Sequence, residues 1–168
     1  MKSLEKSSPN RIIFHGKKKV LDESCYGQYV EMPKEEKKMA SRNYKYYQPN
    51  KKDLKDKYSD CVIRALTKVT GESWTEVFDE LVPIAREMQC VPNEKACYEE
   101  YLKRKGFTYH GVSNKKGTKR PTVDRFSKDH KTGSYVLVVA NHLVSAVDGI
   151  YYDTWESGEY CMYGYWEK

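Results

Sequence analysis

The chain has 168 residues, of which 32% are charged and 13% aromatic, and its formal net charge is +6. This length fits one domain with an appendage and is enough to bury a hydrophobic core. No apolar run approaches the length of a membrane span, and the start MKSLEKSSPN lacks the apolar centre of a secretory signal. The sequence therefore favours a cytoplasmic protein with no membrane partner.

The cysteines argue against two common classes of small protein. There are five, at positions 25, 61, 90, 97 and 161, and no two form a CxxC pair. An odd number without that spacing is not typical of a disulfide framework or of a structural zinc site. We therefore expect free thiols in a reducing compartment, with no metal and no cofactor.

The positive charge is concentrated in the N-terminal third. Residues 1–57 hold 15 Lys/Arg and 8 Asp/Glu, whereas the rest of the chain holds 15 and 16. A basic segment can bind nucleic acid, but acidic residues are interspersed here and solvated lysines are the simpler interpretation. We expect residues 1–47 to be a basic extension that is partly ordered at most. Within it, residues 11–14 and 26–32 could form short strands, and residues 33–47 could begin as a helix.

An aromatic and polar segment, Tyr44 to Asn50, leads toward the first clear helix of the chain. Such a segment can lie across a domain and help to wall a cleft, or it can be a flexible leader. The residues alone leave both alternatives open.

The first clear helix begins near Cys61. Ser59 or Asp60 can serve as its N-cap, and Gly71 is placed to end it. Its apolar side chains are Val62, Ile63, Leu66 and Val69. At the first position of a helix, the exposed amides and the positive end of the dipole favour a thiolate. Cys61 is therefore either a nucleophile or a small buried hydrophobic residue.

A capping box predicts the second helix. Ser73 and Glu76 are three residues apart, so each side chain can bind the backbone amide of the other. Apolar residues then recur on one side as far as Met88. Pro83 lies inside this run and should kink or divide the helix.

Two further helices follow. Asn93 is placed to cap the third, which Gly106 should end, and Cys97 falls on its apolar side as a core residue. Pro121 is placed to begin a short fourth helix, which Gly133 should end.

The periodicity then changes to that of strands. The run 135–140 is rich in β-branched residues and predicts a buried strand, which continues into 142–147. Asp148-Gly149 between two apolar segments predicts a hairpin that returns through 150–155, and 160–166 can supply one more short strand. Helices followed by antiparallel strands indicate an α+β fold.

The hairpin register places a histidine beside a carboxylate. If the turn has two residues, Val147 pairs with Ile150, and His142 lies opposite Trp155 on the same face as Asp153. Asp153 is then the diagonal neighbour of His142, at about 7 Å between backbones. A carboxylate at that position can fix the imidazole tautomer and stabilise its cation. Alternatively, the pair faces water, or Asp153 binds a backbone amide.

A helix-borne cysteine followed by a strand-borne histidine and a carboxylate resembles the papain-like cysteine peptidase superfamily. Asp153-Thr154-Trp155 is similar to the Asn-Ser-Trp of papain-type enzymes, with Asp in place of Asn. Residues 60–66, Trp74 and residues 141–155 are also similar to small proteins of Gram-positive bacteria and their phages. The resemblance covers residues 48–168. It implies a helical subdomain whose nucleophile-bearing helix packs on a small antiparallel sheet.

The resemblance also implies roles for individual residues. Cys61 would be the nucleophile, His142 the general base and acid, and Asp153 the residue that orients His142. Trp155 would shield the His–Asp pair from water. Arg64, one turn into the helix, would either support the charge balance at Cys61 or form a salt bridge to Glu76, Asp79 or Asp153.

One position departs from the family. Papain-like enzymes carry a Gln several residues before the nucleophile, where this chain has Lys55. Asn50 is the candidate replacement as oxyanion donor, a contribution worth on the order of 3 kcal/mol. Two functions therefore remain open. One is a cysteine hydrolase acting on a specific peptide or amide target, and the other is a weakly active or inactive papain-fold protein that binds and blocks a host factor.

Overall fold

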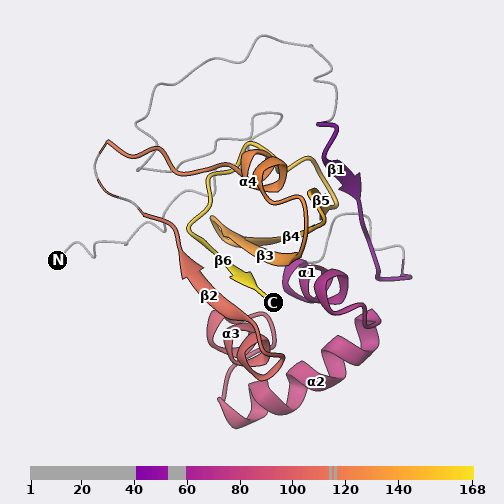
Figure 1. The fold of residues 1–168 in the computed structure, drawn as a ribbon. Coiled ribbons are helices and arrows are strands. Elements are labelled where there is room, and N and C mark those ends of the chain that lie inside the picture. Colours follow the sequence, from indigo (N-terminus) through magenta and orange to yellow (C-terminus); the bar gives the residue numbers. More distant parts are fainter. Residues whose placement is uncertain (1–40, 53–59, 114, 116) are drawn as a thin grey trace, which may run out of the picture. The chain divides into compact units, whose positions relative to one another are not determined.

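The structure is a computed structural model and describes residues 41–52, 60–113, 115 and 117–168 (Figure 1). The strands expected at 11–14 and 26–32, and the start of a helix within 33–40, lie outside these residues. The helices are α1 (Cys61–Thr70), α2 (Trp74–Glu87), α3 (Lys95–Arg104) and α4 (Val123–Asp129). The strands are β1 (Tyr44–Tyr46), β2 (Thr108–Gly111), β3 (Ser134–Val139), β4 (His142–Val147), β5 (Ile150–Asp153) and β6 (Gly164–Glu167). The predicted α+β class is confirmed.

The strands form one sheet in the order β1-β5-β4-β3-β6-β2. β1 pairs parallel with β5, whereas the other neighbours are antiparallel. The sheet is therefore mixed, and the expectation of a purely antiparallel sheet was wrong. Residues 33–47 were expected to begin as a helix, and near the end of this range Tyr44 to Tyr46 form a strand. The alternating tyrosines of β1 suit a pleated edge better than a helix.

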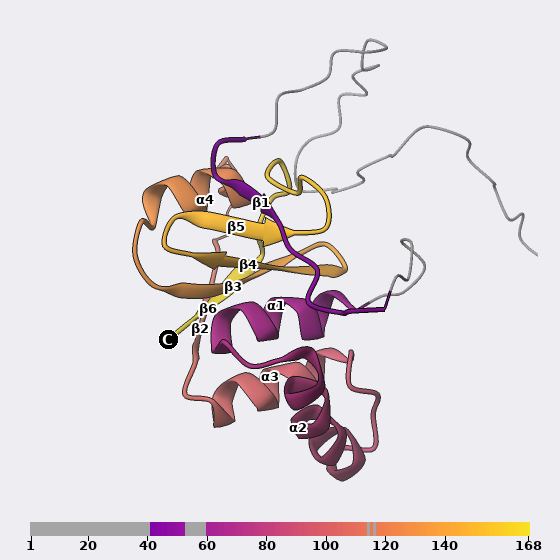
Figure 2. The same cartoon turned by 90° about the vertical axis from the view of Figure 1, so that its right-hand side faces the viewer.

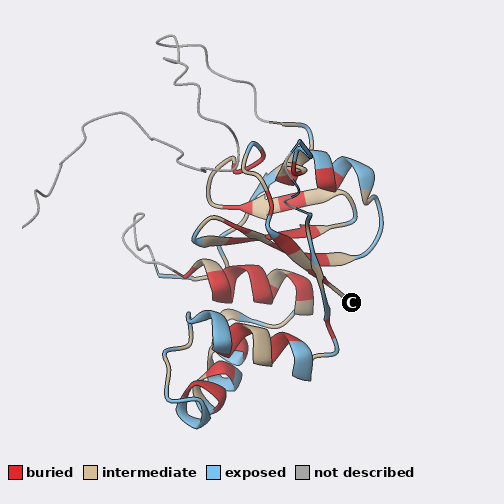
Figure 3. Ribbon diagram, turned by 90° about the vertical axis from the view of Figure 1, so that its left-hand side faces the viewer, coloured by how far each residue is buried: buried red, intermediate tan, exposed pale blue. Residues whose placement is uncertain are grey.

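Helices cover both faces of the sheet (Figures 1 and 2). On one face, α1 packs against β3, β4 and β5, and α2 and α3 pack beyond it. One core lies between these helices and the sheet, and it includes Leu66, Leu81, Leu102, Val136 and Trp166. On the other face, α4 covers a second core that includes Phe126, Leu137 and Tyr151. Seven of the ten residues of α1 are buried, so this helix is held firmly against the sheet (Figure 3).

The ends of α1 follow the sequence with one difference. Gly71 ends the helix with a φ of 79°, a left-handed conformation that glycine adopts at little cost. Asp60 is the N-cap, but its carboxylate accepts no hydrogen bond from the first turn. That part of the capping prediction was wrong, because Asp60 binds other side chains. Ser59, the alternative cap, lies outside the described residues.

The capping box of α2 is confirmed. The Ser73 hydroxyl accepts from the Glu76 amide, and the Glu76 carboxylate accepts from the Ser73 amide. Pro83 was expected to kink or divide this helix, and α2 continues through it without being divided. Pro83 and Asp79 are both exposed, so water can bind the Asp79 carbonyl that loses its helical partner.

The later helices begin slightly after the predicted positions. α3 has Glu94 as its N-cap, not Asn93, although Gly106 follows its end in the left-handed conformation with a φ of 82°. α4 is capped by Thr122, whose hydroxyl accepts from the Arg125 amide, so Pro121 precedes the helix and does not begin it. An extended residue that can accept a hydrogen bond defines the start of α4 better than proline does.

Two tight turns connect β3, β4 and β5. The expected turn at Asp148-Gly149 is present, and both residues have positive φ, 50° and 79°. Val147 pairs with Ile150, so the predicted register is confirmed. A second turn at Ala140-Asn141 separates β3 from β4, where the sequence was interpreted as one continuing run. No helix among the described residues combines the length and apolar character that crossing a membrane requires.

Candidate active site

Three elements bring the predicted site residues together. Cys61 is the first residue of α1, His142 the first of β4 and Asp153 the last of β5. The His142 Nε2 atom lies 2.7 Å from Asp153 Oδ2. The Cys61 thiol is also close enough to His142 to raise the pKa of the imidazole. Because Nε2 is engaged by Asp153, Nδ1 is the imidazole nitrogen left to face Cys61. The diagonal placement expected from the Asp148-Gly149 turn therefore corresponds to direct contact.

The His–Asp pair is shielded from water. The His142 and Asp153 side chains are only 8% and 1% exposed. The Trp155 ring lies against the imidazole, with 4.3 Å between ring centroids and 31° between planes. Trp155 thus occupies the place predicted for it beside His142. In such a low-dielectric setting, the attraction between carboxylate and imidazolium is much stronger than at a surface.

The second carboxylate oxygen of Asp153 is also held. Its Oδ1 atom accepts from the Thr154 amide at 2.7 Å and from the Arg64 guanidinium at 3.2 Å. Both oxygens of Asp153 therefore have defined partners, and these hold the carboxylate in its orientation toward His142.

Arg64 joins the cysteine-bearing helix to this carboxylate. Its Nη1 atom lies 2.5 Å from Asp60 Oδ1, and its Nη2 atom is the one that contacts Asp153. The three side chains are at most 9% exposed. A charge buried to this degree is costly unless an opposite charge is paired with it. Asp153 was one of the expected partners of Arg64, whereas the Glu76 carboxylate bonds to Ser73 instead.

Asp60 is the functional neighbour that sequence reasoning missed. It was considered only as a helix cap, yet its Oδ2 atom accepts from the Trp74 indole at 3.3 Å. A chain of hydrogen bonds thus runs from Trp74 through Asp60, Arg64 and Asp153 to His142. The four-residue spacing between Asp60 and Arg64 on one helix is a sequence signal that could have found this pair.

The environment favours an ion pair between Cys61 and His142. Burial raises the pKa of the Cys61 thiol, but hydrogen bonds from His142 and the Leu143 backbone and the nearby positive charges outweigh it, so the pKa is lowered overall. Burial lowers the pKa of His142, but Asp153 and Cys61 raise it to about 9. A thiolate beside an imidazolium is the form that attacks carbonyl carbon.

Another buried thiol shows the contrast. Cys97 lies in the core with its sulfur 3.6 Å from the Leu81 carbonyl oxygen, and burial raises its pKa to about 11. The prediction that Cys97 is a core residue is confirmed. None of the four described cysteines, at 61, 90, 97 and 161, forms a disulfide. Among the described residues, no three His, Cys, Asp or Glu side chains are grouped as metal ligands.

Asn50, the candidate oxyanion donor, lies in the segment that leads to α1. Its side-chain oxygen accepts from the Lys52 amide at 3.1 Å, which leaves the carboxamide NH₂ as a donor. Nearby, the Tyr47 amide donates to the Asp153 carbonyl oxygen at 2.9 Å, so this segment lies along the sheet edge. Lys55 is outside the described residues.

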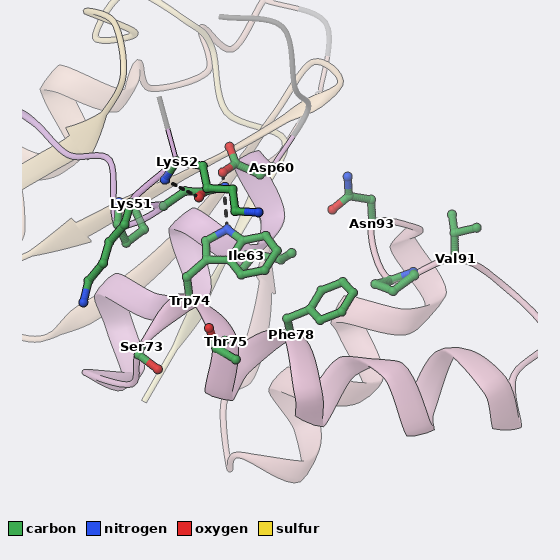
Figure 4. A pocket seen from close by; sticks show the side chains of 13 residues that line it. Lys51, Lys52, Asp60, Ile63, Ser73, Trp74, Thr75, Phe78, Val91 and Asn93 are labelled. Carbon is green, nitrogen blue, oxygen red and sulfur yellow. Dashed lines mark hydrogen bonds between the residues drawn. The ribbon is translucent and has the colours of Figure 1, made fainter. Parts of the chain in front are cut away.

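A cavity of about 770 Å³ adjoins the start of α1 (Figure 4). Its described lining is Pro49, Asn50, Lys51, Lys52, Asp60, Ile63, Ser73, Trp74, Thr75, Phe78, Val91, Pro92 and Asn93. The tyrosine-rich segment therefore continues into a cavity wall, which was one of the two alternatives for it. Cys61, His142 and Asp153 do not line this cavity, although Asp60 does and Cys61 is the next residue.

Comparisons with protein-family models, with curated proteins and with solved structures gave no match. The interpretation of the site therefore depends on its geometry and chemistry.

Proposed function

We propose that this chain is a papain-like cysteine hydrolase that cleaves a specific peptide or amide bond by acyl transfer. The observation that carries the proposal is the arrangement of Cys61, His142 and Asp153. His142 Nε2 lies 2.7 Å from Asp153, and the same imidazole lowers the pKa of the Cys61 thiol at the start of α1. Nucleophile, base and orienting group are the parts that this reaction needs.

In the proposed reaction, the Cys61 thiolate attacks the carbonyl carbon and forms a tetrahedral oxyanion. The His142 imidazolium gives its proton to the leaving amine as the C–N bond breaks, which leaves a thioester on Cys61. Neutral His142 then takes a proton from water, whose oxygen attacks the thioester and releases the acid. Collapse of this second intermediate breaks the C–S bond and expels the Cys61 thiolate, which restores the ion pair with the newly protonated His142. Asp153 keeps the imidazole oriented in both half-reactions.

We propose two donors for the oxyanion, the Cys61 backbone amide and the Asn50 carboxamide. The Asp60 carboxylate points to Arg64 and Trp74, so it does not cap the first-turn amides of α1, including that of Cys61. The Asn50 carboxamide is the proposed second donor, in place of the Gln of related enzymes. Loss of one such donor lowers kcat by roughly 10²- to 10³-fold, so Asn50→Ala should do the same.

The order of elements supports the assignment to the papain-like class. A helix bearing the cysteine precedes the strands that bear the histidine and the carboxylate, and this helix packs on those strands. The mixed sheet, with β1 added at its edge, differs from the antiparallel sheet that the resemblance implied. The described cysteines form no disulfide, which suits a thiol enzyme that acts in a reducing compartment.

The test is a cleavage screen in lysate of a bacterial host. Wild type, Cys61→Ala and the matched variant Cys90→Ala are incubated with lysate, and new protein N-termini are identified by mass spectrometry. Wild type and Cys90→Ala should produce the same new termini, and Cys61→Ala should produce none. Termini that are equally abundant with Cys61→Ala would contradict the proposal.

The second candidate function is a catalytically weak protein that binds and blocks a host factor. The cavity favours it, because a volume of about 770 Å³ is large enough for binding and none of the three proposed catalytic residues lines it. For this function, wild type and Cys61→Ala should capture the same host protein from lysate, without any new termini.

A further inference from the structure

We infer that the cavity beside α1 is the subsite that selects the substrate, and that it takes a large apolar side chain of a peptide whose neighbouring residue is acidic. This inference rests on the proposed function, since it assigns the cavity to the peptide that Cys61 would cleave.

The walls suit an apolar side chain. The rings of Trp74 and Phe78 are stacked, with centroids 5.2 Å apart and planes within 14°, and together they form an apolar surface on the cavity wall. Figure 4 shows the Phe78 ring between Trp74 and the side of the cavity formed by Val91. Ile63 is buried beneath this surface, and Val91 is 57% exposed. An exposed apolar residue next to aromatic rings is typical of a surface that becomes covered on binding.

The charges favour an acidic neighbour. The charged residues among the described lining are Lys51, Lys52 and Asp60. Asp60 is balanced by Arg64, with which it forms a buried salt bridge. The two lysines, both exposed, therefore give the described lining an excess of positive charge. A carboxylate next to the apolar side chain would be attracted to them.

The position links the subsite to the proposed chemistry. Asp60 lines the cavity and Cys61 follows it directly, so their Cα atoms are about 3.8 Å apart. A peptide bound in the cavity can thus extend across the start of α1 to the thiol. Trp74 forms one wall and also donates to Asp60, the residue that holds Arg64 against Asp153. The same side chains therefore shape the cavity and support the orienting carboxylate.

The experiment measures binding separately from cleavage. Fluorescein-labelled peptides carry Phe, Leu, Ala or Lys at one position and Glu or Lys at the next. Binding is measured by fluorescence anisotropy with Cys61→Ala, and cleavage with wild type. We expect Phe-Glu and Leu-Glu peptides to bind at least about tenfold more tightly than Ala-Lys peptides, because a buried large apolar side chain contributes that much by itself.

Matched substitutions locate the binding. Val91→Glu should weaken binding of Phe-Glu peptides at least about tenfold. Met88→Glu is the control, because it also replaces an exposed apolar residue by glutamate, but Met88 lies outside the cavity and its substitution should not weaken binding. Lys52→Glu should weaken binding of the same peptides about fivefold in low salt. Lys119→Glu is the control, because Lys119 is on an exposed loop outside the cavity and its substitution should not weaken binding.

The outcomes separate this inference from the proposed function. Selective binding lost in Val91→Glu supports the subsite, and cleavage of the same peptides by wild type supports the enzyme. Selective binding without cleavage would retain the cavity as a binding site but contradict both the enzyme and the substrate subsite. Cleavage that ignores the Phe-Glu pair and is unchanged in Val91→Glu would overturn the subsite and leave the enzyme standing.

Discussion

The Arg64 guanidinium lies 3.2 Å from the Asp153 carboxylate and holds it from the side opposite His142. Arg64 is on the helix that begins with Cys61, so this contact joins the proposed nucleophile to the proposed orienting residue within the hydrophobic core. The other end of the guanidinium is held by Asp60. One buried cation thus sets the relative position of the two elements that carry the site.

Removal of that cation should be costly. Arg64→Met leaves Asp60 and Asp153 buried without their shared partner, and breaking a buried pair in this way costs about 3–5 kcal/mol. Urea unfolding should show that loss. The matched control is Arg104→Met, since Arg104 makes exposed bridges to Glu87 and Glu100 and should change stability by less than about 1 kcal/mol. Equal effects of the two substitutions would contradict the role of Arg64.

The Asp60→Asn/Arg64→Met double variant separates stability from positioning. It removes one of the two stranded carboxylates, so it should recover part of the lost stability. Activity should remain low, because Asp153 would still lack the contact that fixes its Oδ1 atom. Full recovery of activity would show that Arg64 acts only on stability.

Asp153→Asn should alter how stability depends on pH. The His142 pKa is about 9 against an ordinary 6.5; burial alone lowers it, and Asp153 is first among the groups that raise it. A raised pKa contributes stability that is fully present below pH 6.5 and is lost as pH rises through about 9. Below pH 6.5, the free energy of unfolding of wild type should therefore exceed that of the variant by up to about 3 kcal/mol, and above about pH 9 the difference should be smaller. A stability difference that grows with rising pH would contradict this account.

Trp155→Ala should weaken the His–Asp pair without removing it. Water would reach the imidazole face that the indole now covers, and screening would reduce the attraction between His142 and Asp153. We expect kcat/KM to fall about tenfold. Trp155→Phe keeps an aromatic cover and should stay near wild type. A Trp155→Ala kcat/KM that coincides with wild type would show that the indole has no such role.

Much of this site could be predicted because local signals determine it. The left-handed Asp148-Gly149 turn sets the register of β4 and β5, and that register places Asp153 next to His142. The start of α1 at Cys61 follows from a polar residue before an apolar helical repeat. Each of these features depends on residues that are close in sequence.

The rest depends on contacts between distant segments or on ambiguous patterns. β1 pairs with β5, which lies more than 100 positions later in the chain. The three residues of β1 contain no pattern that indicates which distant strand they pair with. The Ala140-Asn141 turn lacks glycine, and its Asn141 takes a φ of 52°, which asparagine tolerates better than most residues. The Asp60 carboxylate could cap its own helix or pair with Arg64, and the preference depends on a buried partner that only the tertiary structure supplies.

The central claim is that Cys61 is a thiolate paired with His142, and its most direct test is the pH dependence of Cys61 alkylation. Iodoacetamide labelling is followed peptide by peptide in wild type and His142→Ala, with Cys97 as the internal control for a core thiol. In wild type, Cys61 should react well below the ordinary thiol pKa of 9.0 and faster than the other cysteines, whereas His142→Ala should shift its titration toward that value. Identical titrations near the ordinary value in both proteins would contradict the account.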